Sequence, residues 1–344
     1  MRRLGRWAAR LAAALLLIAA ALAAPSLWVE ATCRGEPAPQ RAALIEPEHR
    51  RAEARTLLTY PEWHIVHAYD DYARVIATDD PHDYGYLRAI GGFWSSFCAL
   101  SREADALGTE DGGARQTVHV IGVSFTAELL AKAAYEETLG RLATLVRGPE
   151  HAPLDRLSAE QAAEYATFLQ QVPWYRWDFD AAADALGAAA TGAARDRERL
   201  AALGLEYRAK AAYARAIARA VEGVGADAPT LRLIAAPGTP APDGATVVDT
   251  RPEGVVMEVP RYRALTRMLV GMAAAGGDFV EIAGNDDILV TTLSEAPAPG
   301  ALATLPRQGS ALMRNLHVVK VPALAAFLRE AEGAGLRVEH IHDY

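Results

Sequence analysis

A long apolar run near the N-terminus constrains this chain more than any other feature. Residues 11–29 read LAAALLLIAAALAAPSLWV, and arginines precede them at positions 2, 3, 6 and 10. As a helix rising 1.5 Å per residue, the roughly 21 residues from Trp7 to Trp28 span about 31 Å, the thickness of a bilayer's hydrocarbon core. The sequence therefore predicts contact with the lipid bilayer through residues 8–29, with a tryptophan at each interface.

The charges around this run predict its orientation. Arginines before it and a mixed flank after it favour a cytoplasmic N-terminus and an exported body. Ala21-Leu22-Ala23 offers the small-x-small site of a cleaved signal peptide, which is the alternative. Pro25 and the continuation of the run to Val29 favour retention instead. We expect residues 1–30 to be a signal-anchor transmembrane helix of a bacterial inner membrane, with the body in the periplasm.

Composition predicts a folded body after the anchor. The 344 residues are 51% hydrophobic and 23% charged, far from the composition of disordered chains. The net charge of −8 argues against nucleic acid, and against an anionic membrane surface, as the partner.

The two cysteines, Cys33 and Cys98, fit an oxidising compartment. We expect them to form a disulfide, which in the chain-entropy model contributes roughly 4 kcal/mol for a loop of about 65 residues. Two unpaired thiols, one of them in an aromatic helix, are the alternative.

The body divides by pattern into a helical domain (31–225) and an α+β domain (226–344). Helix signals and apolar periodicity in the first domain predict the helices 60–77, 83–107, 115–147, 158–171 and 194–221. The first of these begins with Thr59-Tyr60-Pro61-Glu62, which has the spacing of a capping box, and Ser158 is the expected cap of the fourth. Residues 235–244 are rich in proline and glycine and read as a linker or loop.

Two similar segments organise the C-terminal domain. Met257-Glu-Val-Pro260 and Val319-Lys-Val-Pro322 each begin a strand–helix–strand unit, and an additional strand is expected at 288–293. Placed in one antiparallel sheet, the two units make a ferredoxin-like (βαβ)2 sandwich with one extra strand. The predicted fold class is therefore α+β, with a transmembrane helix, a mainly α-helical bundle and this sandwich. The fold hosts many functions and implies none of them.

An internal repeat lies in two of the long helices. Glu128-Leu-Leu-Ala-Lys132-Ala-Ala-Tyr135 aligns with Glu206-Tyr-Arg-Ala-Lys210-Ala-Ala-Tyr213, so two of the three lysines occupy equivalent positions. Glutamate and lysine four residues apart support a helix by about 0.2–0.5 kcal/mol, and the repeat then marks a packing seam. Presented twice, Glu128, Lys132, Glu206 and Lys210 could instead line a ligand-binding cleft.

The strongest candidate for chemistry is a polar stripe on the first helix of the body. His64, His67 and Asp71 share one face at spacings of three and four residues. Two imidazoles and a carboxylate could bind a metal such as zinc, or Asp71 could orient His67 for proton transfer. A stripe that faces solvent or is simply hydrogen-bonded is the favoured interpretation. No pattern in the sequence marks a further metal ligand, and the candidates are His119, Glu128 and Cys98.

Two other features are weaker. His340 and His342 alternate onto one face of the last expected strand, where a metal or a pH-sensitive contact competes with a satisfied or exposed terminal pair. The aromatic loop 173–179 could stack on a ligand, lie at the membrane interface or pack on the core.

Three blocks carry a resemblance to a known family: residues 59–72 (TYPEWHIVHAYDDY), 90–98 (IGGFWSSFC) and 123–128 (VSFTAE). With them the chain resembles a family of uncharacterised bacterial membrane-anchored proteins. The resemblance covers the anchor and much of the helical domain. It implies no activity, cofactor or site residue.

Two hypotheses for function follow. The first is a non-catalytic, membrane-anchored periplasmic protein that binds a small ligand, a second copy of itself or another membrane protein. The second is a metal-dependent or acid/base enzyme that uses His64, His67 and Asp71. The first is favoured because the sequence contains no HExxH, paired CxxC or GxSxG motif.

Overall fold

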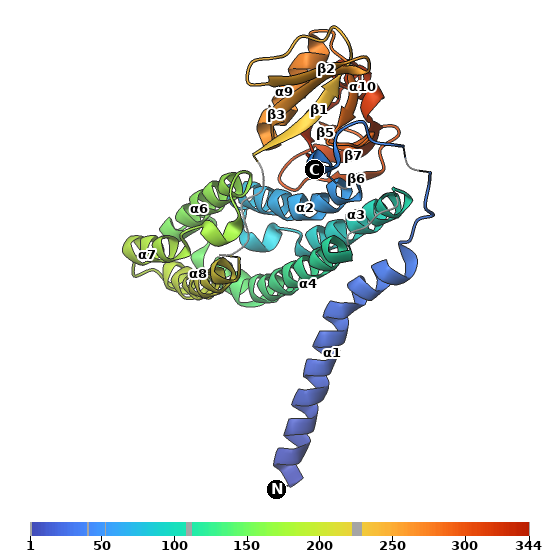
Figure 1. The fold of residues 1–344 in the computed structure, drawn as a ribbon. Helices are drawn as coiled ribbons and strands as arrows, with labels where there is room; N and C mark the ends of the chain where they lie inside the picture. The colour runs from blue at the N-terminus through green and yellow to red at the C-terminus, as the bar shows by residue number, and fades with distance from the viewer. Residues whose placement is uncertain (1, 40, 52, 108–111, 222–228, 344) are drawn as a thin grey trace.

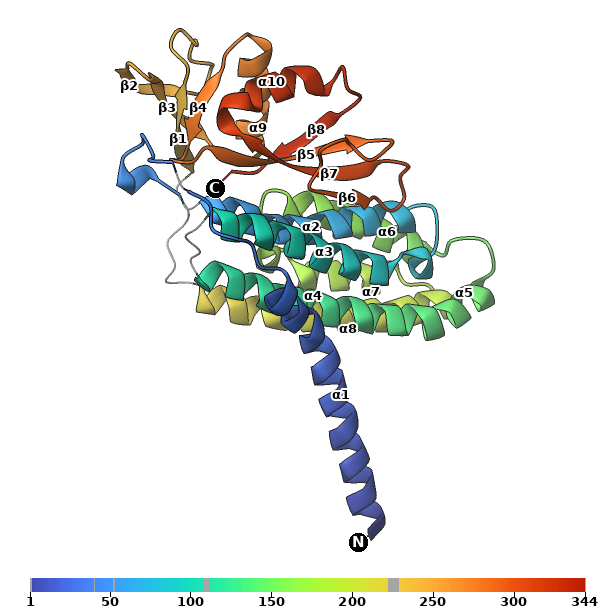
Figure 2. The ribbon, with the colours of Figure 1, turned by 90° about the vertical axis from the view of Figure 1, so that its right-hand side faces the viewer.

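The computed structural model describes residues 2–39, 41–51, 53–107, 112–221 and 229–343. In this part of the chain a long N-terminal helix projects from a body with two parts, an array of helices and an α+β part stacked on it (Figures 1 and 2). The helices are on the side of the body from which the N-terminal helix emerges. The boundary expected at residue 225 lies outside the described residues.

The projecting helix, α1 (Arg2–Thr32), contains a segment, Ala12–Thr32, that is long and apolar enough to cross a membrane. The side chain of Trp7 lies outside the described residues, and Trp28 is 46% exposed. The last turn of α1 and the residue after it join the body, where Val29 and Cys33 are fully buried. Cys33 forms the expected disulfide with Cys98, with the two Cα atoms 5.1 Å apart.

The helices of the body follow the expected order, with one addition. They are α2 (Glu53–Ile76), α3 (Tyr86–Ala106), α4 (Gly112–Tyr135), a π-helical turn (Glu136–Gly140), α5 (Arg141–Arg147), α6 (Pro153–Leu169), α7 (Phe179–Ala189) and α8 (Ala194–Ala220). Helix α7 was not expected. It follows a short 3-10 turn in the aromatic segment (Trp174–Arg176), whose rings pack with Tyr165, Phe179 and Tyr207.

Two helix starts differ from the sequence prediction. Helix α2 begins at Glu53, so Thr59 lies inside it, and the Thr59 hydroxyl donates to the Thr56 carbonyl at 2.7 Å. The predicted capping box is therefore wrong. Leu57 and Leu58 are buried, and their packing extends the helix upstream of the cap signal. Helix α6 likewise begins at Pro153, which leaves Ser158 in its interior.

The α+β part contains two four-stranded antiparallel sheets with the same topology. Their strands are β1 (Thr230–Ala235), β2 (Thr246–Arg251), β3 (Gly254–Pro260) and β4 (Phe279–Ile282), then β5 (Asp287–Ser294), β6 (Ala303–Pro306), β7 (Met313–Lys320) and β8 (Arg337–Ile341). The orders are β2-β3-β1-β4 and β6-β7-β5-β8. Each half therefore repeats the pattern strand, strand, strand, helix, strand, with α9 (Tyr262–Ala274) in the first half and α10 (Val321–Ala331) in the second.

This arrangement keeps the two predicted strand–helix–strand units but corrects the sheet. The ferredoxin-like expectation places all strands in one sheet, whereas the described strands form two. Strands β1, β2 and β6 were not expected, and the predicted linker 235–244 is mainly the connection between β1 and β2. Both sheets and both helices share one core, which includes Leu233, Leu269, Phe279, Ile288 and Leu324.

The second sheet also packs on the helices. Leu289 of β5 and Leu316 of β7 join the same apolar cluster as Leu57 of α2 and Phe93 of α3. One face of α2 is thus covered by the second sheet, and another faces α4. Polar residues packed against these two faces of α2 form the two clusters described next.

Candidate functional site

The repeated glutamates and lysines of α4 and α8 meet in one half-buried network, in which the side chains are 16–31% exposed. The Lys210 ammonium lies 2.7 Å from Glu128 and 2.9 Å from Glu206, and the Lys132 ammonium lies 3.1 Å from Glu206. The structure therefore brings all four predicted ligand-binding residues together. The expected i,i+4 pair is present within α8, but the other contacts run between the two helices. Each lysine pairs with the glutamate of the opposite repeat.

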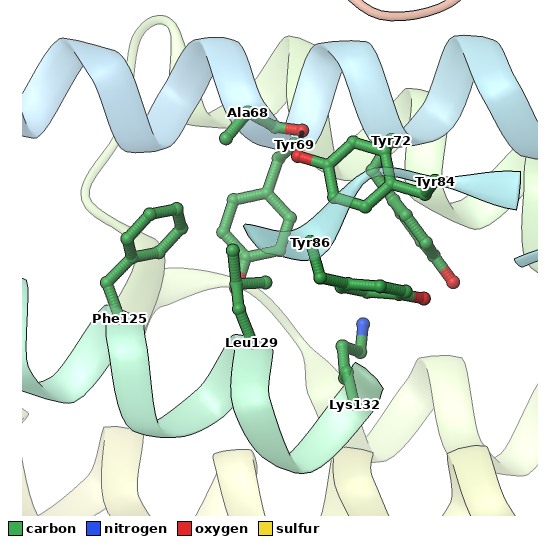
Figure 3. Close-up of a pocket in the computed structure, with 8 residues that line it drawn as sticks. All are labelled: Ala68, Tyr69, Tyr72, Tyr84, Tyr86, Phe125, Leu129 and Lys132. Atoms are coloured by element: carbon green, nitrogen blue, oxygen red, sulfur yellow. Dashed lines mark hydrogen bonds between the residues drawn. The ribbon is translucent and has the colours of Figure 1, made fainter. Parts of the chain in front are cut away.

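Beside this network lies a pocket walled by tyrosines, which we call the tyrosine pocket (Figure 3). Its lining is aromatic and aliphatic except for one ammonium group. The lining residues are Ala68, Tyr69, Tyr72, Tyr84, Tyr86, Phe125, Leu129 and Lys132. They come from α2, from the turn that leads into α3, and from α4. The space between their atoms is about 230 Å³ when the open solvent at the mouth is included, and the inner part holds about one water-sized group.

Hydrogen bonds fix the tyrosine hydroxyls around this pocket. Tyr84 donates to the Ala68 carbonyl at 3.0 Å, and Tyr86 donates to the Pro81 carbonyl at 2.8 Å. Tyr69 donates to Glu128 at 2.5 Å and accepts from Lys210 at 3.3 Å, so it links the pocket to the ion network. The Lys132 ammonium lies 4.7 Å from the centre of the Tyr72 ring, within the range of a cation–π contact.

The electrostatics of the network hold its groups in their charged forms. Burial alone would raise the pKa of Glu206, but Lys132 and Lys210 outweigh it and lower that pKa to about 2. Burial would likewise lower the pKa of Lys132, yet Glu206 and neighbouring groups raise it. Burial and the charge of Glu128 raise the pKa of the Tyr69 phenol. Two ammonium and two carboxylate groups balance each other beside neutral phenols.

A second cluster lies where α2 meets the second sheet. His64 and His67 of α2 approach His340 of β8 and His342, which follows β8; we call these four residues the histidine cluster. All four are at least 92% buried. The rings of His340 and His342 are 4.7 Å apart, and that of His340 lies 4.4 Å from Trp63. The two histidine pairs singled out in the sequence, more than 270 residues apart, therefore meet in space.

Few of the imidazole nitrogens in this cluster have partners. His64 Nε2 lies 2.9 Å from the Ala89 carbonyl, and His340 Nδ1 lies 3.2 Å from the Thr266 hydroxyl. Within the described part of the chain, His64 Nδ1, His67 Nε2, His340 Nε2 and both nitrogens of His342 are buried without a hydrogen bond. A Cβ at Gly92 would come within 2.7 Å of the His64 ring, so a glycine on α3 makes room for this imidazole.

Desolvation sets the protonation of the histidine cluster. Burial lowers the pKa of His64 and that of His340 to about 4. Burial, aided by the charge of Arg314, lowers the pKa of His67, and burial with the neighbouring His340 and His67 lowers that of His342. These imidazoles are neutral at neutral pH, in contrast to the charged network on the other side of α2.

The structure separates the members of the predicted stripe. Asp71 accepts from the Gln308 backbone N–H at 2.9 Å and from Arg307 Nε at 3.3 Å, and so ties α2 to the chain between β6 and β7. His64 and His67 lie among aromatic rings instead. All three residues are buried, which corrects the expectation of a solvent-facing stripe. The three residues are buried because the second sheet covers this face of α2.

The guessed further ligands lie elsewhere. His119 bonds Ser26 and Glu30 of α1, Cys98 is in the disulfide, and Glu128 belongs to the ion network. Among the described residues, three ligand atoms from His, Cys, Asp or Glu come within 4.8 Å of one another at Asp80, His82 and Asp83. Asp80 is already paired with Arg147 at 2.8 Å.

Sequence reasoning missed part of both clusters. Tyr84 and Tyr86 were not expected beside the network, although a Tyr-Gly-Tyr turn before a helix is a visible aromatic signal. The predicted exposed or satisfied state of His340 and His342 is also corrected, because both rings are buried and three of their four nitrogens have no partner. Comparison with protein-family models, curated proteins and solved structures finds no match.

Proposed function

We propose that this chain is a single-pass membrane-anchored protein whose exported body binds a small ligand in the tyrosine pocket without transforming it. Helix α1 is the anchor in a bacterial inner membrane, with the N-terminus in the cytoplasm and the body in the periplasm. The apolar length of Ala12–Thr32, the arginines before it and the disulfide next to it support this arrangement.

The observation that carries binding rather than catalysis is the protonation of the two clusters. A general acid or base works best when its pKa lies near the operating pH. In these clusters the pKa of Glu206 lies near 2, those of His64 and His340 lie near 4, and those of both lysines are raised. Each group is held in one state at neutral pH, which supports a binding site.

The lining of the tyrosine pocket indicates the ligand's chemistry. The two glutamates and two lysines of the ion network have no net charge, so the network offers no charge for an ionic ligand to neutralise. The walls are rings and aliphatic carbons, and the Lys132 ammonium keeps N–H donors besides the one directed at Glu206. We therefore propose a neutral ligand whose small acceptor group enters the inner part of the pocket, while its aromatic or aliphatic body lies in the open mouth.

The test uses p-cresol as the probe and toluene as its analogue without the acceptor oxygen. The full chain in detergent is heated with each compound, and its Tm is recorded. We expect p-cresol to raise the Tm by several degrees, since a ligand at 100 times its Kd adds about 2.7 kcal/mol of stability. Toluene should raise it much less.

Two variants on α4 make the test specific to the pocket. Leu129→Phe fills the pocket, because Leu129 lines it, and should abolish the p-cresol shift. Leu130→Phe, one residue further along the helix and 38% exposed, should keep it. Equal shifts in both variants, or equal shifts from toluene and p-cresol, would refute the pocket as the ligand site.

The anchor is tested separately in cells. The full chain should stay in the membrane fraction after carbonate extraction, and its body should be cut by protease added to the periplasmic side. Release of the whole chain by carbonate would rule out retention of the anchor. Chemical cross-linking before solubilisation would then reveal whether the body also contacts a second copy or another membrane protein.

The alternative is a metal-dependent or acid/base enzyme at His64, His67 and Asp71. It is less well supported, because both Asp71 oxygens accept hydrogen bonds and His64 Nε2 contacts a carbonyl. The observation in its favour is His67 Nε2, which makes no hydrogen bond in the described structure and lies 3.9 Å from Glu339. Metal analysis of the purified chain, repeated on a His64→Ala/His67→Ala variant, decides the metal version: bound metal lost in the variant would support it.

A further inference from the structure

The lowest layer of the body, on the side of the anchor, carries exposed apolar side chains. Helices α4, α5 and α8 form this layer, and α1 emerges past it in both views (Figures 1 and 2). The side chains are large and aliphatic, and project where no other described helix covers them. They are Val120, Leu130, Leu142, Leu145, Val146 and Leu205, with Leu139 in the turn between α4 and α5, and we call them the outer face. Leu145 and Leu205 are 79% and 74% exposed.

Helix α4 is uncharged along its exposed side. Its exposed residues between 113 and 134 are glycine, glutamine, threonine, valine, serine, leucine and alanine. Its charged residues Glu128 and Lys132 belong to the ion network, and Arg115 is buried and paired with Asp105 of α3. A water-facing helix of a globular body normally carries charge on its outer side. The outer face therefore lacks a covering partner.

Contacts between α1 and α4 place the outer face close to the membrane that α1 would span. Ser26 lies inside the candidate span Ala12–Thr32, and its hydroxyl is 2.7 Å from His119 Nδ1 of α4. Glu30 continues the contact, 2.7 Å from His119 Nε2. Because α4 touches the span itself, a membrane that contains the span also reaches α4. In both views α4 runs across the direction of α1, as a helix lying along the bilayer surface does (Figures 1 and 2).

The exposed charged side chains of the neighbouring helix, α8, are positive and therefore suited to contact with anionic lipid. Among the described residues of α8, the exposed charged side chains are all arginines, Arg197, Arg208, Arg215 and Arg219, of which Arg215 is paired with Asp180 of α7. The whole-chain net charge of −8, which argues against an anionic surface, hides this local excess. Basic side chains beside apolar ones are the pattern of surfaces that insert shallowly between lipid headgroups.

From these observations we propose that the outer face of α4, α5 and α8 lies on the bilayer that holds α1, with its leucines and valines among the headgroups and the α8 arginines on anionic lipids. This inference rests on the anchoring part of the proposed function and not on the tyrosine pocket. A bilayer fits better than a second protein because the face continues directly from the span.

Depth-dependent quenching tests the proposal in the full chain. Because no described cysteine is free, a single added cysteine can carry an NBD fluorophore. Three variants are labelled: Val146→Cys on the outer face, Val248→Cys on β2 as the matched control, and Leu17→Cys in the span. Each is placed in nanodiscs of phosphatidylcholine, with or without phosphatidylglycerol, and with a quencher on the lipid acyl chain.

We expect Val146→Cys to be quenched at least threefold more strongly than Val248→Cys, and more with phosphatidylglycerol than without it. Equal quenching at the two valine sites while Leu17→Cys is quenched would overturn the docking but leave the anchor intact. No quenching at Leu17→Cys would overturn the anchor itself. Energy transfer between Val146→Cys labels without lipid quenching would assign the face to a second copy instead.

A charge variant provides the second arm of the test. Leu142→Glu/Leu145→Glu places two carboxylates on exposed positions of α5, where they disturb no buried contact. We expect this variant to reduce the quenching at Val146→Cys to the level of Val248→Cys, with the Leu17→Cys signal unchanged. Persistence of the Val146→Cys signal would contradict an energetic role for these leucines in docking.

Discussion

The two faces of α2 bury polar groups in opposite ways. On the face toward α4 and α8, the Glu–Lys network is charged and every charge has an opposite charge within 3.1 Å. On the face toward the second sheet, the histidine cluster is neutral and leaves five imidazole nitrogens without a hydrogen bond. Helix α2 therefore lies between an ion-compensated network and a cluster in which burial suppresses charge, with Asp71 on the second face paired to Arg307.

The difference has consequences for what each cluster can tolerate. A buried ion network fails when one member is removed, because the remaining charge is uncompensated. A cluster of neutral unpartnered rings gains little from its polar atoms, so it tolerates apolar replacement and instead fails when it is protonated. The predictions below test this contrast by mutation and by pH.

The largest expected effect is acid destabilisation through the histidine cluster. His64 and His340 have folded pKa values of about 4, below the value of about 6.5 for an unfolded histidine. The unfolded chain then binds protons first, so the stability these groups contribute is fully present above pH 6.5 and is lost as the pH falls toward 4. The loss by pH 4 is about 3 kcal/mol for each histidine, or about 6 kcal/mol for both.

Urea unfolding of the full chain in detergent at pH 7.5, 6, 5 and 4 measures this loss. A His340→Gln variant should lose about 3 kcal/mol of this pH dependence, the contribution of one histidine. His151→Gln, outside the cluster in the loop before α6, should follow the parent protein. A free energy of unfolding that stays constant from pH 7.5 to pH 4 would show that the imidazoles are not buried as described.

The next largest effect is expected from Lys210→Met in the ion network. The substitution keeps the side-chain length but leaves Glu128 and Glu206 with one ammonium between them. We expect a loss of about 3–5 kcal/mol in the free energy of unfolding at pH 7.5, measured in urea. Adding Glu128→Gln to this variant should recover part of the loss, because it removes one of the two uncompensated charges.

The matched control lies on the same helix. Arg215 pairs with Asp180 at 2.7 Å, and both side chains are more than half exposed. Arg215→Met should therefore cost less than about 1 kcal/mol. Similar losses for Arg215→Met and Lys210→Met would mean that the network behaves like a surface ion pair.

The ion network was partly predictable and the histidine cluster was not. Glu128, Lys132, Glu206 and Lys210 were found because a repeated local spacing marks equivalent helix positions. Their crosswise pairing depends on how α4 and α8 approach each other, which spacing does not encode. His64 and His67 were noticed as a stripe, but the strand that covers them ends at residue 341, and no local pattern reports such a distant partner.

The same limit explains the errors in the fold. Strand β2 is exposed at nearly every position, so it has no apolar alternation, and β6 lies between prolines that indicate a loop. Helix α7 is mostly alanine, which predicts helix by propensity but shows no clear apolar stripe. Strands β3, β5 and β7 were found within a few residues, because their apolar residues are regularly spaced and their ends are marked by proline or polar turns.

A smaller effect is expected from removing one hydroxyl that hydrogen-bonds to the ion network, that of Tyr69. Tyr69→Phe removes a phenol that donates to Glu128 and accepts from Lys210. Hydrogen bonds to charged groups contribute about 1.5–3 kcal/mol, and we expect a loss in this range at pH 7.5 in urea. Tyr213→Phe on α8, whose ring is 51% exposed, is the control and should change stability by less than about 0.5 kcal/mol. A loss below about 0.5 kcal/mol for Tyr69→Phe would mean that the Tyr69 hydroxyl does not stabilise the network.

The smallest effect is expected for His342→Phe. This ring is 99% buried, and both its nitrogens lack partners in the described structure, so an apolar ring of similar shape removes polar atoms that gain nothing from burial. We expect the free energy of unfolding at pH 7.5 to change by less than about 1 kcal/mol and the acid sensitivity to decrease. A loss above about 2 kcal/mol would mean that the His342 nitrogens bind a water, an ion or a ligand, and that the contrast between the two faces of α2 is smaller than these contacts indicate.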